Sequence, residues 1–130
     1  MDELTKKFVT ALGELHRADD VEPLVALFGD GATLNKAGMP PHGQSGKDGA
    51  RTFWEQYRRV FGEIESTFHH VVTGDGIAFL EWTSNGTLTN GSEFGYDGVS
   101  VLESSGEEIE AFRTFYDTAA FLEKQSAIRS

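Results

Sequence analysis

Apolar and polar residues alternate along much of the second half of the chain. Alternation of this kind places apolar side chains on one face of a strand and polar side chains on the other. The pattern predicts four long strands, over residues 64–73, 77–87, 93–102 and 109–116. Each of the first three strands ends at a turn sequence: Gly74-Asp75-Gly76, Thr89-Asn90-Gly91 and Ser104-Ser105-Gly106. Short turns between successive strands predict an antiparallel sheet.

The first half of the chain has apolar residues at helical spacing instead. Residues 2–18 predict a helix with Phe8, Leu12 and Leu15 on one face. The remaining segments predict a second helix over 21–28, a short strand over 32–35, a third helix over 47–61 and a last short helix over 118–123. Two prolines and three glycines in residues 36–46 predict an irregular loop.

The order of these elements determines the fold class. A sheet with one apolar face must cover that face, and here the helices come before the long strands. We therefore predict an α+β fold in one domain of residues 1–130, with a curved antiparallel sheet wrapped around the N-terminal helices. The hollow between sheet and helices is the expected ligand site.

Composition narrows the function classes. The chain has no Cys, which excludes disulfides, thiolate nucleophiles and Cys-based metal sites. Its formal net charge of −10 disfavours nucleic acid, because binding to a phosphate backbone needs clustered Lys and Arg. No apolar run reaches the length of a membrane span. We expect a cytoplasmic protein with no metal site, no cofactor and neither nucleic acid nor membrane as a partner.

Three segments resemble one superfamily. VEPLVALFGDGATLN is similar to the second helix and first strand of the nuclear transport factor 2 and ketosteroid isomerase superfamily, and GKDGARTFWEQYRRVF to its third helix. The strand block from Gly76 to Asp117 resembles the SnoaL-like branch. The resemblance covers residues 4–123 and implies a cone-shaped α+β fold with one pocket between the concave sheet face and the helices. Members include isomerases, dehydratases, polyketide cyclases, epoxide hydrolases and noncatalytic binding modules.

The catalytic residues of the better-known branches have no counterparts in this chain. Ketosteroid isomerases use an Asp after the first strand, a Tyr on the first helix and an acid on a long strand. The matching positions here hold Asn35-Lys36, Leu12 and Gly98. SnoaL-like cyclases and limonene epoxide hydrolases place an Asp in the final strand, where this chain has Thr114. The resemblance therefore implies the pocket without a recognised base.

Strand alternation assigns the side chains that would line this pocket. If Thr114 faces inward, the residues two positions away on its strand do so too, and alternate residues on neighbouring strands follow. The predicted ligand-binding residues are Trp54, Tyr57, Trp82, Ser84, Tyr96, Phe112, Thr114 and Tyr116. Aromatic rings with hydroxyl groups suit a flat apolar ligand that carries a carbonyl or hydroxyl group. The alternative is that these side chains only fill the core.

Three residues are candidates for the acid–base group. His42 lies in the Pro/Gly loop, where an imidazole at the pocket rim could transfer protons near neutral pH; ordinary solvation in a loop is the alternative. Asp97 is either a buried base or an outward-facing charge. Asp117 is the acid closest to Thr114 in sequence, but alternation puts it on the opposite face, and its alternative role is to cap the last helix.

Two further pairs have a structural interpretation. His69 and His70 are consecutive strand residues, so we expect them on opposite faces and not as a metal pair. Glu81 and Arg113 are expected to form an outward-facing ion pair between strands.

Two functions remain open from the sequence. The first is an enzyme that transfers a proton next to a carbonyl, by cyclisation, isomerisation or dehydration, on a small hydrophobic molecule. The second is a noncatalytic ligand-binding or dimerisation module of the same fold. In both cases we expect a homodimer formed through the outer face of the sheet.

Overall fold

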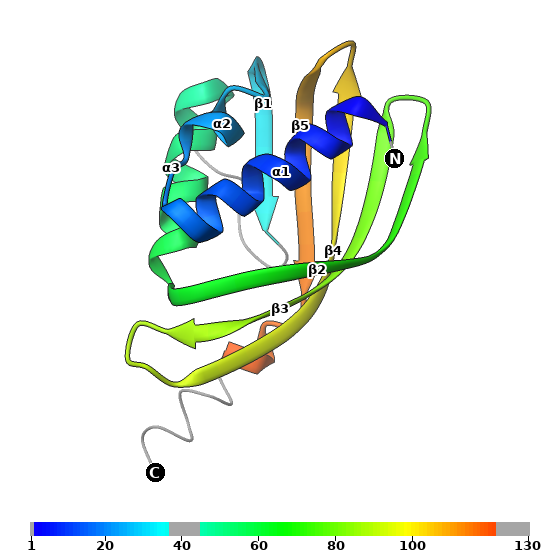
Figure 1. The fold of residues 1–130 in the computed structure, drawn as a ribbon. Coiled ribbons are helices and arrows are strands. Elements are labelled where there is room, and N and C mark those ends of the chain that lie inside the picture. Colours follow the sequence, from blue (N-terminus) through cyan, green and yellow to red (C-terminus); the bar gives the residue numbers. More distant parts are fainter. Residues whose placement is uncertain (1, 37–44, 122–130) are drawn as a thin grey trace.

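The computed structural model describes residues 2–36 and 45–121. Within these residues, three helices lie on one side of a curved sheet (Figure 1). The helices are α1 (Glu3–Ala18), α2 (Glu22–Val25) and α3 (Gly46–Arg59). The strands are β1 (Phe28–Lys36), β2 (Phe61–Gly74), β3 (Ile77–Leu88), β4 (Glu93–Ser105) and β5 (Glu108–Tyr116). The predicted α+β class, with a curved sheet around N-terminal helices, is confirmed.

The five strands have the order β1-β5-β4-β3-β2. The long strands β2 to β5 pair antiparallel, as predicted, and β1 pairs parallel to β5. Lys36 of β1 is the register partner of Thr114 on β5, and Thr114 is that of Ser100 on β4. Strands β2 to β4 bend strongly, so that the sheet is concave toward the helices (Figure 1).

Helix α1 is defined by its caps and its apolar stripe. The Asp2 carboxylate accepts a hydrogen bond from the Thr5 backbone N–H at 2.8 Å and thereby caps the N-terminus. At the other end, Asp19 adopts a left-handed conformation (φ 56°) and its N–H donates to the Leu15 carbonyl at 3.1 Å. Phe8 and Leu15 are each 1% exposed, which places the apolar stripe against the sheet.

Helix α2 is shorter than the sequence predicts. It ends at Val25, and Phe28, expected in the helix, begins β1. Phe28 pairs with Ile109 of β5, and the Ile109 N–H donates to the Leu27 carbonyl at 2.8 Å. Strand pairing and complete burial of Phe28 therefore outweigh the helical spacing of the segment.

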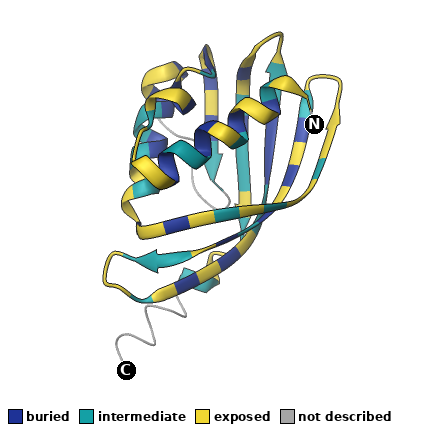
Figure 2. Ribbon diagram, viewed as in Figure 1, coloured by how far each residue is buried: buried dark blue, intermediate teal, exposed yellow. Residues whose placement is uncertain are grey.

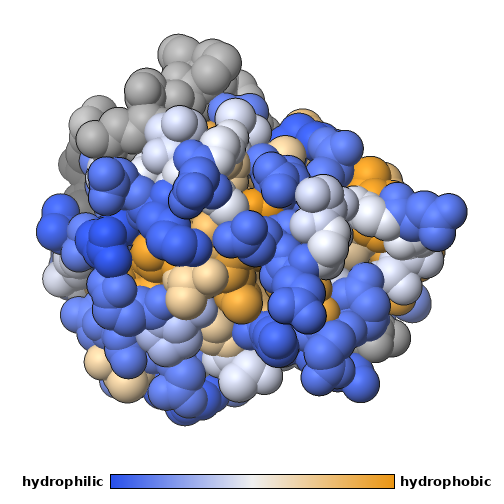
Figure 3. Space-filling view, turned by 90° about the horizontal axis from the view of Figure 1, so that it is seen from above, coloured by the Kyte–Doolittle hydropathy of each residue, from blue (hydrophilic) through white to orange (hydrophobic). Residues whose placement is uncertain are grey.

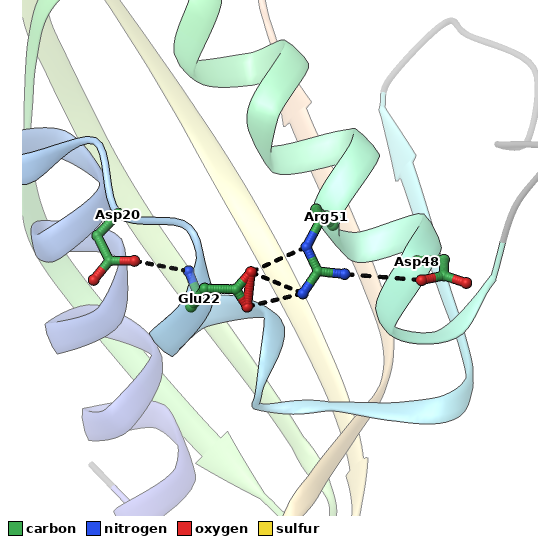
Figure 4. A network of polar contacts seen from close by, with 4 residues as sticks. All are labelled: Asp20, Glu22, Asp48 and Arg51. Carbon is green, nitrogen blue, oxygen red and sulfur yellow. Dashed lines mark hydrogen bonds and ion pairs between the residues drawn. The ribbon is translucent and has the colours of Figure 1, made fainter.

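A polar network joins α2 to α3 (Figure 4). The Arg51 guanidinium donates to both carboxylate oxygens of Glu22 at 2.8 Å and lies 3.8 Å from Asp48. The Glu22 N–H in turn donates to the Asp20 carboxylate at 3.1 Å. Since these groups are largely exposed to solvent, which weakens ion pairs, the network orients α2 on α3 more than it stabilises the fold.

The buried residues form two clusters on the concave side of the sheet. The larger joins α1 and α3 to the sheet and includes Phe8, Phe53, Trp54 and Phe112. The smaller is mostly aromatic: its members are Phe61, Ile64, Trp82, Phe94 and Tyr96. Buried and exposed positions alternate along the strands (Figure 2). Seen from above, hydrophilic residues cover much of the surface and hydrophobic residues show between them (Figure 3).

A β-bulge in β2 overturns the expectation for His69 and His70. The register shifts between Phe68 and His70, so both imidazoles reach the outer face. His69 Nε2 lies 2.8 Å from Thr83 Oγ1, and His70 Nδ1 lies 2.6 Å from Glu81 Oε1. Alternation alone could not predict this, because the extra residue resets the period.

The predicted ion pair between Glu81 and Arg113 is also wrong. Glu81 bonds to His70 on β2, its register partner. Arg113 instead pairs with Glu103 of the adjacent strand β4. Both charges face outward as expected, but β4 separates the strands that carry them.

Candidate functional site

A cavity of about 340 Å³ lies between the concave sheet face and helices α1 and α3. Its wall includes members of both buried clusters, so it occupies the space between them. All the residues predicted to contact a ligand line it: Trp54, Tyr57, Trp82, Ser84, Tyr96, Phe112, Thr114 and Tyr116. Trp54 and Phe112 are 3% and 2% exposed and belong to the larger cluster, so they are core and cavity wall at once.

The sequence did not single out several other residues of the wall. They are Phe8, Leu12, Lys36, Phe53, Val60, Phe61, Ser66, Phe68 and Phe121. Alternation along β4 predicts that Ser100 faces inward with Tyr96, and Ser100 lines the cavity. Alternation along β2 could have identified Ser66 and Phe68, which share a face with their register partners on β3. Lys36 is the last residue of β1 and lies at the start of the loop. Neither strand nor helix periodicity predicts the direction of its side chain there.

A row of hydroxyl groups crosses the sheet at the cavity wall. Ser100 Oγ and Thr114 Oγ1 lie 3.0 Å apart on β4 and β5. The indole Nε1–H of Trp82 donates to the same Ser100 oxygen at 3.0 Å. The indole is therefore fixed by a buried hydrogen bond, and Thr114, next to Lys36 in register, extends the row toward β1.

A second chain of polar groups crosses the wall between α1 and the cavity. His16 Nε2 lies 2.8 Å from the Tyr57 hydroxyl, and although burial raises the Tyr57 pKa overall, Ser66 is near enough to that hydroxyl to lower that pKa. Ser66 Oγ lies 2.6 Å from Ser84 Oγ on β3. The chain thus links a buried imidazole at the end of α1 to a hydroxyl in the cavity wall.

Burial keeps the ionisable members of this region uncharged. Desolvation, together with the positive charges of the nearby Arg58 and Arg17, lowers the pKa of His16 to about 4. Desolvation raises the pKa values of Tyr57, Tyr96 and Tyr116 above the ordinary phenol value. At neutral pH the imidazole is neutral and the phenols keep their protons for hydrogen bonding.

Lys36 brings a charge to the cavity wall. It is half-buried, and its Nζ lies 5.2 Å from the centroid of the Phe53 ring, within cation–π distance. Desolvation lowers the pKa of its ammonium group. Among the described residues it is the one Lys, Arg, His, Asp or Glu in the cavity wall.

The acid–base candidates lie outside this wall as far as the structure describes it. Asp97 is exposed on the outer sheet face, where it accepts a hydrogen bond from Thr83 Oγ1 at 2.6 Å. Asp117 is exposed and accepts from the Ala119 N–H at 3.0 Å, the geometry of its alternative role as a cap. His42 lies outside the described residues.

The wall also holds a donor without a partner. Trp54 Nε1 is buried and makes no hydrogen bond with any residue in the described ranges. A buried indole N–H without an acceptor carries a desolvation penalty.

Within residues 2–36 and 45–121, no three His, Asp or Glu side chains are placed to hold a metal ion. In the same ranges no helix is long and apolar enough to cross a membrane.

The comparisons with known proteins agree with the fold. The family model described as the SnoaL-like domain matches residues 6–112. No curated protein matches the chain. Among solved structures, a candidate isomerase from Rhodopseudomonas palustris is 13% identical, with a TM-score of 0.84 over 98% of each chain.

Two further solved structures are similar at the level of the fold. A candidate SnoaL-like polyketide cyclase from a Jannaschia species is 12% identical over 94% of this chain and 93% of its own, with a TM-score of 0.73. A protein with a ketosteroid isomerase-like fold from Catenulispora acidiphila, in complex with trimethylamine, is 17% identical over 90% of each chain, with a TM-score of 0.77. Because the family model covers most of the sequence, the chain belongs to the SnoaL-like domain family.

Proposed function

We propose that the protein binds a small, flat, apolar molecule that carries a carbonyl or hydroxyl group. The observation that carries this proposal is the cavity of about 340 Å³, whose wall combines aromatic rings with the hydroxyls of Ser84, Ser100 and Thr114. Ligand sites are typically apolar concavities of roughly 300–1,000 Å³ with a few convergent polar groups. The complex of the Catenulispora acidiphila protein with trimethylamine supports the use of this fold for small molecules.

Calorimetric titration with aromatic ketones and lactones, beginning with 2-acetylnaphthalene, tests this function. Ser100 and Val99 are neighbours on β4 that face opposite sides of the sheet. We expect Ser100→Phe to fill the cavity and weaken binding at least tenfold, and the matched variant Val99→Phe to leave binding within twofold. Failure of every ketone and lactone to bind the wild type, or equal binding by both variants, would contradict the proposal.

Proton transfer next to a carbonyl is the second candidate function. It is favoured by the chain of polar groups from Ser84 through Ser66 and Tyr57 to His16, in which Ser84 bonds to Ser66 and Tyr57 to His16. Because its pKa is about 4, the neutral imidazole is a weak base that can hold a proton only transiently, and each hydroxyl can accept one proton while it donates another. A proton that leaves a ligand beside Ser84 would reach His16 by successive transfers along this chain.

Deuterium exchange at the α-carbon of 2-tetralone in heavy water separates an enzyme from a binding module. An enzyme of this type should accelerate the exchange, and Tyr57→Phe, which interrupts the chain, should reduce the rate at least tenfold. Calorimetry on the same samples determines whether Tyr57→Phe still binds the ketone. Binding of 2-tetralone without accelerated exchange would show that the protein binds the ketone but does not catalyse the exchange. An unchanged exchange rate in Tyr57→Phe would exclude this chain as the path of the proton.

A further inference from the structure

Lys36 places a positive charge where the rest of the cavity wall is apolar or hydroxylic. The side chain lines the cavity from the end of β1, and it is half-buried. Its register partner Thr114 bonds to Ser100, so the ammonium group and the hydroxyl row belong to adjacent strands. A ligand that reaches the hydroxyl row would therefore also come close to Lys36.

The charge of Lys36 has no counterion within the described part of the chain. Its described contact is with the Phe53 ring, at 5.2 Å from Nζ to the centroid, and no carboxylate forms an ion pair with it. An ammonium group that loses water without gaining an anion is destabilised, which agrees with the lowered pKa of Lys36. An anion in the cavity would supply the missing interaction.

The charge distribution allows Lys36 to select for anionic ligands. The protein as a whole carries a formal charge of −10, which repels anions at long range. No Asp or Glu is part of the described cavity wall, so no carboxylate there would pair with a cationic ligand. An acid that binds in the cavity despite the long-range repulsion must be held by short-range contacts. Lys36 is the charged residue of the described wall that can make such a contact.

We propose that the bound molecule is an anion, an aromatic carboxylate or an enolate, and that Lys36 binds its negative oxygen and determines this specificity. The proposal rests on the proposed function, because it names the chemical class of the molecule in the same cavity. The apolar body lies among the aromatic rings, and the charged oxygen lies between Lys36 and the hydroxyls of Thr114 and Ser100. Charge-assisted hydrogen bonds are the stronger ones, so Lys36 contributes most of the polar part of the affinity.

Two probes with the same ring system test the class of ligand. 2-Naphthoate is an anion at pH 7, and 2-acetylnaphthalene is neutral and of similar shape. We expect the wild type to bind the acid at least tenfold more tightly than the ketone in calorimetric titrations. In Lys36→Met we expect the affinity for the acid to fall at least tenfold and the affinity for the ketone to stay within twofold of the wild type. Lys36→Arg should keep most of the affinity for the acid.

Lys6→Met is the matched control, because it changes the net charge equally at an exposed position of α1. We expect it to bind both probes like the wild type. Equal wild-type affinity for the acid and the ketone would overturn the anion proposal and leave the proposed function standing, as would an unchanged acid affinity in Lys36→Met. Binding of neither probe would overturn both. The wild-type comparison decides the question even where Lys36→Met is unstable.

Discussion

Single residues show where the alternation argument succeeds and where it ends. It could predict the wall residues Trp82, Ser84 and Thr114, because each lies inside a long strand whose apolar face is buried. The same period places Asp97 outward, since its neighbours Tyr96 and Gly98 occupy the concave face. Lys36 could not be found this way, because its orientation depends on tertiary packing at the end of a short strand. The chain from His16 to Ser84 could not be found either, since it joins residues far apart in sequence.

His16 should make the stability of the fold depend on pH. The unfolded chain binds a proton at this residue below about pH 6.5, whereas the folded protein resists protonation until about pH 4. Protonation therefore favours the unfolded state, and stability present above pH 6.5 is lost as the pH falls toward 4. Between pH 7 and 5 we expect a loss of about 2 kcal/mol from this group.

Urea unfolding of the wild type and of His16→Gln at both pH values measures this contribution. Gln can still bond to Tyr57 but does not titrate, so the variant should lose less stability than the wild type over the same range. Carboxylates titrate equally in both proteins and cancel in the difference. Identical losses in the two proteins would show that His16 is protonated as easily in the folded state as in the unfolded chain.

At the scale of elements, each helix and each long strand could be predicted from the sequence. The residues at which they begin and end could be predicted less well. The apolar stripe of α1 and the turns between β2, β3, β4 and β5 are local signals, and the structure follows them. The early end of α2 and the bulge at His69 arise from pairing with other strands, Phe28 with Ile109 and β2 with β3. A local pattern contains no information about such partners, so these details could not be read from the sequence.

Strand β4 passes Trp82 so closely that Gly98 has room for no side chain. A Cβ atom at Gly98 would lie 2.4 Å from Trp82 Cζ2 and 2.6 Å from the Phe115 carbonyl oxygen. We expect Gly98→Ala to displace the Trp82 indole from its bond to Ser100 and to cost about 1–3 kcal/mol of stability. Urea unfolding and the tryptophan emission spectrum measure the two effects.

Gly31 on β1 is the matched control for Gly98. An added Cβ there meets no atom within 4 Å, so Gly31→Ala should unfold at nearly the wild-type urea concentration. If Gly98→Ala is as stable as Gly31→Ala and its emission is unchanged, then β4 can move away from Trp82 and the close packing at this point does not fix the indole.

At the scale of the molecule, the curvature of the sheet produces the cavity. Strands β2 to β4 bend so that the sheet is concave toward the helices (Figure 1), and the side chains of the two buried clusters do not fill the space between them. The order of elements along the chain could predict this architecture, as could the resemblance to the superfamily. The parallel pairing of β1 with β5 could not be predicted from the chain order, and it is this pairing that brings Lys36 beside Thr114.

The outer face of the sheet should join two copies of the chain, and this homodimer stays a prediction. Val72, Phe79 and Phe115 are 64%, 44% and 49% exposed there. Phe79 is the register partner of both Val72 and Val101, and Phe115 is that of Val99, so the exposed rings belong to an apolar strip across the strands. A strip of this kind can bury itself against a second copy related by a two-fold axis.

Sedimentation velocity at micromolar concentrations tests the dimer. We expect Phe79→Ser with Phe115→Ser to give a monomer with an unchanged circular dichroism spectrum, and Val60→Ser, an exposed apolar position outside this face, to remain dimeric. Because each copy carries a formal charge of −10, added salt should strengthen the wild-type dimer by screening the repulsion. A wild type that sediments as a monomer in high salt, or a double variant that stays dimeric, would mean that this face is not the contact between copies.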